Sequence, residues 1–148
     1  PWGFNCRGWA YNGLRNYPKA IEDLTRAIEL EPKYASAYSH RSGSYYWLAK
    51  YQQALEDANK AIELDPRLGG AYFNRGRALA SLNNIQDALK DYDRAIQLDP
   101  MFSPSFLFRA HAFLKLNNKE RALEDFKKAA SLGNKAAQDY LKKKGIQW

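Results

Sequence analysis

The chain has 148 residues, a net charge of +7 and one cysteine, Cys6. This length is typical of a single domain with its own apolar core, and one cysteine excludes an internal disulfide. No apolar run reaches the roughly 18 residues that a membrane span needs, and the N-terminus lacks a basic-then-apolar signal segment. We therefore expect a soluble protein. The cytoplasm is slightly favoured, although a disulfide-free extracellular domain would have the same cysteine content.

The positive charge is unevenly distributed along the chain. Six of the seven excess charges lie in residues 103–148, which include the tract Lys142-Lys143-Lys144. A solvated helix face, with lysines near a helix C-terminus, accounts for so short a tract. Nucleic-acid binding through this basic third is therefore the less favoured alternative.

Similar hexapeptides recur at a fixed interval of 34 residues. AIELEP occupies 27–32, AIELDP 61–66 and AIQLDP 95–100, and a divergent copy, AASLGN, occupies 129–134. Alignment on this interval divides the chain into four copies, at 1–34, 35–68, 69–102 and 103–136. The sequence thus predicts an array of equal units within one domain, 1–148.

Each copy has the periodicity of two helices, at about 2–14 and 18–30 in the first copy. The first helix of every copy carries a large, a small and a second large residue, at Phe4/Tyr38/Tyr72/Phe106, Gly8/Ser42/Gly76/Ala110 and Tyr11/Tyr45/Leu79/Phe113. The second helix carries two alanine columns, Ala20/Ala54/Ala88/Ala122 and Ala27/Ala61/Ala95/Ala129. Small residues let two helices approach closely, and the large residues fill the space beside them.

The recurrent hexapeptide is interpreted as a helix terminator. The acidic residue before Pro32, Pro66 or Pro100 is pushed out of the helical conformation by the proline ring, and the chain turns into the next copy. Ser103-Pro104 is predicted to be an N-cap followed by proline in the first turn. Gly69-Gly70 is assigned to the turn between two copies.

The 34-residue interval, the aromatic/small/aromatic pattern, the paired alanines and the closing proline resemble the tetratricopeptide repeat family over residues 1–136. The resemblance implies an all-α fold, an α-solenoid of four helix-turn-helix units in a right-handed superhelix. The last segment, KKAASLGNKAAQDYLKKKGIQW, drifts toward the related Sel1-like repeats. Residues from about 135 to 144 are predicted to form a capping helix, which covers the apolar face of the last copy.

Two charged columns recur together. Arginine stands at Arg7, Arg41, Arg75 and Arg109, where leucine is common in the family, and aspartate stands at Asp23, Asp57, Asp91 and Asp125. Columns of opposite charge with the same interval indicate a repeated ion pair, rather than a ladder of ligand-binding arginines.

The sequence has no pattern typical of catalysis or of a metal site. His40 and His111 lie in different copies without a further ligand-type residue at metal-binding spacing, and Cys6 has no histidine nearby. A glycine-rich phosphate loop is also missing. We therefore predict a protein that is not an enzyme and needs neither metal nor cofactor.

Proteins similar to this family hold a peptide or helix of another protein in the concave groove formed by their first helices. The faces of these helices that are not needed for packing supply our candidate peptide-binding residues, namely Asn5, Trp9, His40, Tyr46, Trp47, Phe73, Asn74, Arg77, Phe108 and His111. Aromatics mixed with polar residues and arginine are typical of interface centres. The alternative is that some of them, particularly Trp47 and Phe108, pack as core between adjacent helices.

The best-known groove of this family is a carboxylate clamp for the C-terminal tails of heat-shock chaperones, built from lysine, asparagine and arginine of three successive first helices. The corresponding places in copies one to three hold Asn5, Trp9, His40, Gly70 and Asn74. One copy further along, they hold Ser39, Gly43, Asn74, Pro104 and Phe108. The cations are missing in both alignments, so we predict that this clamp is absent.

A second hypothesis is a structural module that assembles with copies of itself. The first copy carries Trp2 and Trp9, which would dock on a neighbouring chain, because repeat stacks join end to end.

Overall fold

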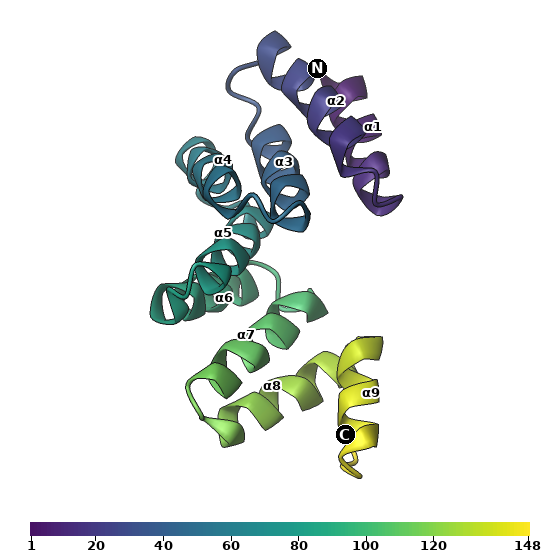
Figure 1. Ribbon diagram of the computed structural model, residues 1–148, viewed down its shortest axis with the longest axis vertical. Coiled ribbons are helices and arrows are strands. Elements are labelled where there is room, and N and C mark those ends of the chain that lie inside the picture. Colours follow the sequence, from purple (N-terminus) through teal and green to yellow (C-terminus); the bar gives the residue numbers. More distant parts are fainter.

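The computed structural model describes residues 1–148 and contains nine α-helices and no β-strand (Figure 1). The helices are α1 (Trp2–Gly13), α2 (Tyr17–Leu30), α3 (Ala35–Trp47), α4 (Tyr51–Leu64), α5 (Gly69–Ser81), α6 (Ile85–Leu98), α7 (Ser103–Lys115), α8 (Lys119–Ser131) and α9 (Lys135–Lys143). The first eight form four consecutive pairs. This arrangement confirms the predicted all-α solenoid of helix-turn-helix units. None of the helices, the longest of which has 14 residues, could reach across the apolar layer of a membrane.

The pairs follow one another along the long axis of the molecule, and the two termini lie at opposite ends (Figure 1). α1 contacts α3, α3 contacts α5 and α5 contacts α7, whereas no comparable contact joins α2 to α4 or α4 to α6. A stack curves toward the side on which its successive helices touch. The odd-numbered helices therefore line the concave face, and all ten candidate residues lie on them.

Residues without bulk allow the two helices of a repeat to approach closely, as the sequence predicts. A Cβ atom added to Gly8 would lie 2.6 Å from Leu24 Cγ, and one added to Gly76 would lie 2.8 Å from Tyr92 Cε1. In the second repeat, Ser42 takes the same place and donates a hydrogen bond of 2.7 Å to the carbonyl of Ala54. The small columns thus set the distance between paired helices.

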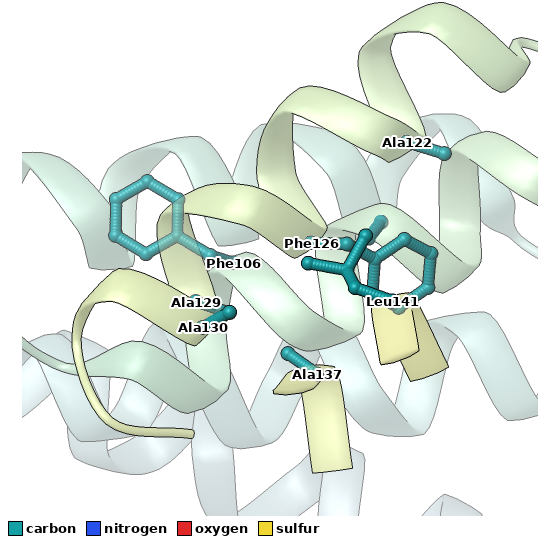
Figure 2. Packing of buried hydrophobic residues seen from close by; sticks show 8 residues of the cluster. Phe106, Ala122, Phe126, Ala129, Ala130, Ala137 and Leu141 are labelled. Atoms are coloured by element: carbon teal, nitrogen blue, oxygen red, sulfur yellow. The ribbon is translucent and has the colours of Figure 1, made fainter. Parts of the chain in front are cut away.

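α9 closes the apolar end of the stack. Its residues Ala137 and Leu141 are fully buried against the side chains of α7 and α8 (Figure 2). Tyr140 stacks on Phe126, with ring centroids 4.0 Å apart. The predicted capping helix is thereby confirmed, because without α9 the buried face of α8 would be open to water.

Two kinds of turn connect the helices. Between repeats, the chain leaves the helix at Glu31, Asp65 and Asp99, whose φ angles of −142°, −141° and −140° confirm the predicted terminator. Within each repeat, one residue adopts a left-handed conformation, with φ between 57° and 66°, at Arg15, Ala49, Asn83 and Asn117. The following N–H then bonds back into the first helix, as from Lys50 to the carbonyl of Tyr45. This is the hydrogen bond of a Schellman motif.

Two local predictions about helix starts are wrong. Ser103 is the first residue of α7 and Phe102 occupies the N-cap position, so the serine does not cap the helix. Gly69 and Gly70 begin α5 instead of forming a turn. A Cβ at Gly69 would lie 3.3 Å from Leu98 Cβ, so the close approach of α6, the second helix of the same repeat, favours a glycine there. The inter-repeat turn itself falls on the residues just before α5.

Candidate peptide-binding groove

At the N-terminal end of the concave face, polar side chains join neighbouring first helices. Asn5 donates to the Tyr34 hydroxyl at 3.2 Å, and its amide oxygen lies 2.9 Å from His40 Nδ1. The His40 carbonyl in turn accepts a hydrogen bond of 3.1 Å from Asn12 Nδ2. Burial lowers the pKa of His40 and so favours its neutral form in the folded chain. Asn5 and His40 thus serve first to hold α1 against α3.

Asn74 makes the equivalent link one repeat further on. Its Nδ2 donates a hydrogen bond of 2.9 Å to the carbonyl of Ser39, which ties α5 to α3. Its Oδ1 accepts a longer bond, 3.3 Å, from Arg77 Nη1. Asn74 therefore connects the polar links between helices to the aromatic side chains that surround Arg77.

Four aromatic rings from α3, α5 and α7 surround the guanidinium of Arg77. The Arg77 Cζ atom lies 3.6 Å from the ring centroid of Tyr46, 4.9 Å from that of Trp47 and 5.2 Å from those of Phe73 and Phe108. We call these five side chains the Arg77 cluster. All five are sequence-predicted candidates, and they come together from three repeats.

Arg77 is nearly inaccessible to water. Only 6% of its surface is exposed, and no carboxylate forms an ion pair with it. Its Nε and Nη2 atoms have no hydrogen-bond partner, and neither does the buried hydroxyl of Tyr92. Desolvation lowers the pKa of Arg77 and raises that of Tyr92. The concave face thus contains a buried positive charge that the protein's own carboxylates do not neutralise.

Trp47 is the most accessible member of the cluster, with 57% of its surface exposed. Its ring stacks on Tyr17 of α2 at a centroid distance of 6.1 Å and meets the edge of Tyr46 at 5.5 Å. Phe73, by contrast, is buried in the core next to Tyr92, at a centroid distance of 6.3 Å. Of the aromatic candidates in this cluster, Trp47 is therefore the one most available to a partner.

Two candidates, Trp9 and His111, belong neither to the Arg77 cluster nor to the polar links between helices. Trp9 is 63% exposed on α1. His111 on α7 meets Phe126 edge-on at 5.2 Å. The sequence interpretation also missed two residues next to the cluster, Tyr17 and Tyr92, because they lie on second helices. The sequence does contain a sign of Tyr92: its hydroxyl stands at a repeat position where the other copies have apolar residues, Leu24, Ala58 and Phe126.

The repeated arginines and aspartates pair as predicted, away from the candidate groove. In each repeat, arginine Nε and Nη2 donate to the two oxygens of one aspartate at 2.6–2.8 Å, in Arg7–Asp23, Arg41–Asp57, Arg75–Asp91 and Arg109–Asp125. Three of these arginines also reach the preceding repeat, for example from Arg41 Nη1 to Thr25 Oγ1 at 2.9 Å. The aspartates are buried, which the sequence did not predict. These pairs therefore join helices within and between repeats.

The structure offers no cluster of three or more His, Cys, Asp or Glu side chains that could hold a metal ion. Cys6 is partly buried and unpaired. A hollow of about 310 Å³ lies between α7, α8 and α9 and is lined mainly by the apolar side chains of Leu114, Leu123, Phe126, Tyr140 and Ile146. It lies outside the Arg77 cluster.

Comparison with protein families covers nearly the whole chain. Two family models, both described as tetratricopeptide repeat, match it in alternation, one at residues 1–34 and 70–102 and the other at residues 35–68 and 103–132. The matched segments coincide closely with the four repeats. A comparison with curated protein sequences gives no significant match.

Solved structures of similar architecture include three of particular interest. MamA is 24% identical with a TM-score of 0.73, over 91% of this chain and 79% of that chain. TTC0263, a thermophilic TPR protein of Thermus thermophilus, is 21% identical with a TM-score of 0.81, over 88% and 73%. The first TPR of Spaghetti (RPAP3), bound to the HSP90 peptide SRMEEVD, is 26% identical with a TM-score of 0.72, over 78% and 92%. Because their sequences are only 24% and 21% identical to this chain, the similarity to MamA and to TTC0263 is evidence of the fold alone.

Proposed function

Since the chain belongs to the tetratricopeptide repeat family, we propose that it is a non-enzymatic protein-interaction scaffold, which holds a peptide segment of a partner protein against the Arg77 cluster. The observation that carries the proposal is the convergence of Tyr46, Trp47, Phe73, Arg77 and Phe108 from three successive repeats on the concave face. Aromatic residues and arginine are enriched where interface energy concentrates, and Trp47 remains largely exposed.

A peptide ligand is supported by the RPAP3 domain, which is similar to this chain and whose structure contains an HSP90 peptide. The chemistry in this chain differs, however, because the places of the chaperone-tail clamp carry no lysine or arginine. Two of those places, Asn5 and Asn74, hold neighbouring helices together. We therefore expect no binding of SRMEEVD that depends on its free C-terminal carboxylate. Calorimetric titration with the free peptide and with its C-terminal amide tests this expectation.

The proposed function is tested with a library of random 12-residue peptides displayed on phage. Peptides selected on the wild-type chain should bind poorly to Trp47→Ala, which removes an exposed ring from the groove. The matched control is Trp2→Ala, since Trp2 is also exposed but lies at the start of α1. Phe73 is left unchanged in this test, because it is part of the core and its loss would disturb folding. Equal loss of binding in both tryptophan variants, or no loss in either, would contradict the proposal.

Self-assembly is the second candidate function. Trp2 and Trp9 on α1 are 72% and 63% exposed, and large exposed apolar rings often mark contact surfaces. If these rings dock on another copy, the mass measured by light scattering should rise with protein concentration. Trp9→Ser should then shift the equilibrium to monomer. A constant monomer mass from micromolar to millimolar concentration excludes this candidate.

A further inference from the structure

Arg77 differs from the other arginines of the odd-numbered helices. Arg7, Arg41, Arg75 and Arg109 each present Nε and Nη2 to the two oxygens of an aspartate. In Arg77 the same two atoms, Nε and Nη2, are the ones that lack a partner. The edge of the guanidinium that binds a carboxylate in the four other arginines thus has no hydrogen-bond acceptor here.

The missing acceptor is energetically significant because Arg77 cannot lose its charge. A guanidinium stays protonated in proteins, and burial without a counterion is unfavourable. The ring of Tyr46, 3.6 Å from Arg77 Cζ, offsets part of this cost through its π electrons. It does not supply hydrogen-bond acceptors for Nε and Nη2. A carboxylate would supply two, in the planar geometry that an arginine fork prefers.

We infer that Arg77 receives the carboxylate of a glutamate or aspartate side chain from within the bound peptide segment. This inference rests on the proposed function and adds the chemistry of the partner: an acidic residue flanked by apolar ones, which would contact Trp47 and Phe108. The cluster's single positive charge calls for a single negative one.

The burial of Arg77 favours the carboxylate of an acidic side chain over the C-terminal carboxylate of a peptide. Only 6% of Arg77 is exposed, and Tyr46 and Trp47 lie against its guanidinium. A carboxylate on a narrow stem of methylenes can pass between such rings after a small movement of Trp47. A C-terminal carboxylate has no such stem, so the backbone and side chain of the last peptide residue would have to enter between the rings as well. Arg77 also lies three positions after Asn74, outside the places that the chaperone-tail clamp would use.

The phage library distinguishes this inference from the proposed function. Peptides selected on the wild-type chain should share an acidic residue at one position. Changing that residue to Gln or Asn should weaken binding to the wild type about 10- to 100-fold, as expected for hydrogen bonds to a charged group. The same change in the peptide should hardly alter its affinity for Arg77→Met, whose methionine side chain has a similar length but no charge. Arg94→Gln, an equal change of net charge at an exposed position of α6, should bind these peptides like the wild type.

The results of the selection separate a failure of this inference from a failure of the proposed function. Peptides that depend on Trp47 but share no acid, or that lose equal affinity in Arg77→Met, would overturn the inference and leave the proposed function standing. If the selected peptides bind only through a free C-terminal carboxylate, Arg77 does not receive an acidic side chain and the inference is wrong. A library that yields no peptide dependent on Trp47 overturns the proposed function and the inference together.

Nuclear magnetic resonance gives a direct readout at the atom concerned. The Nε–H resonance of Arg77, identified by its loss in Arg77→Lys, should move on titration with a selected acidic peptide. It should stay in place with the Gln or Asn version of that peptide at equal occupancy of the groove, monitored at the Trp47 indole N–H. Movement of the Trp47 resonance without any response of Arg77 Nε–H would contradict the inference.

Discussion

Arg41 and Asp57 join the two helices of the second repeat through a forked ion pair, in which Nε and Nη2 of the arginine lie 2.7 Å and 2.8 Å from the two carboxylate oxygens. Both groups are mostly buried. Arg41 also donates to Thr25 of the first repeat. One side chain therefore links three helices, and the arrangement recurs in the following repeats.

We expect Asp57→Asn to lower the free energy of unfolding by about 3 kcal/mol, because it leaves the Arg41 guanidinium without a counterion in a mostly buried place. Chemical denaturation followed by circular dichroism measures the loss. The matched control is Asp87→Asn, which breaks the exposed pair with Lys90 and should leave stability almost unchanged. Similar losses in the two variants would show that the forked pair has no special importance.

Gly76→Ala should destabilise the third repeat by about 1–3 kcal/mol. The new methyl group would lie 2.8 Å from the Tyr92 ring and 3.2 Å from the Ala88 carbonyl, and the backbone carbonyl cannot easily move. Gly3→Ala places the same methyl group where no atom lies within 4 Å. Its melting temperature should stay constant or rise, because alanine favours a helix. If Gly76→Ala melts at the wild-type temperature, the close helix approach does not limit residue size.

Ala49→Gly should raise stability by about 1 kcal/mol, because Ala49 has a φ of 57° and its Cβ makes the left-handed conformation unfavourable. Asn83 occupies the same place in the next repeat with a φ of 66°. Asparagine tolerates this conformation, so Asn83→Gly should change the denaturation midpoint much less. A loss of stability in Ala49→Gly would mean that the flexibility of glycine outweighs the relief of strain.

Arg77→Met should raise the free energy of unfolding by about 1 kcal/mol, because it removes two buried donors that have no partner. Loss of the contact with Tyr46 limits the gain. A more stable but binding-deficient variant would mark Arg77 as a residue kept for function. If the variant instead unfolds more readily, the aromatic contacts of Arg77 contribute more than its burial costs.

Stability should fall as the pH is lowered from 7.5 to 5.5. Burial lowers the pKa of His40 and of His111 below the usual 6.5. Below that value, the unfolded chain binds protons that the folded chain still refuses, so the free energy of unfolding decreases until the folded pKa values are passed. Urea titrations at several pH values measure the slope. The double variant His40→Gln, His111→Gln should lose most of it, whereas an unchanged slope would point to other groups.

The fold was accessible from the sequence because its determinants are local and repeated. Gly8 and Gly76 recur at the place where helices touch, and the residue before each proline marks a helix end. Ser103 and Gly69 were assigned wrongly, since a serine next to proline and a glycine pair have the same local pattern inside a helix as at its border. Both residues contact positions much later in the chain, Leu98 for Gly69 and Asn134 for Ser103, and a local sequence pattern does not show such contacts.

The candidate groove was only partly accessible. The helix period placed Tyr46, Trp47 and Arg77 on one face, and the structure brings these three side chains together. The sequence did not reveal that Arg77 would be buried without a carboxylate, because its neighbours come from three repeats. It also did not reveal that Asn5 and Asn74 would bond to neighbouring helices, since an exposed amide and a bonded one have the same pattern.

The Arg77 cluster draws its rings from α3, α5 and α7, so whatever occupies it spans two joints of the solenoid at once. A stack of this kind bends at its joints like a soft spring, because each repeat contacts only its neighbours. An occupant that bridges two joints would stiffen the middle of the molecule and fix its curvature. Binding at Arg77 would then make the whole solenoid less easy to bend.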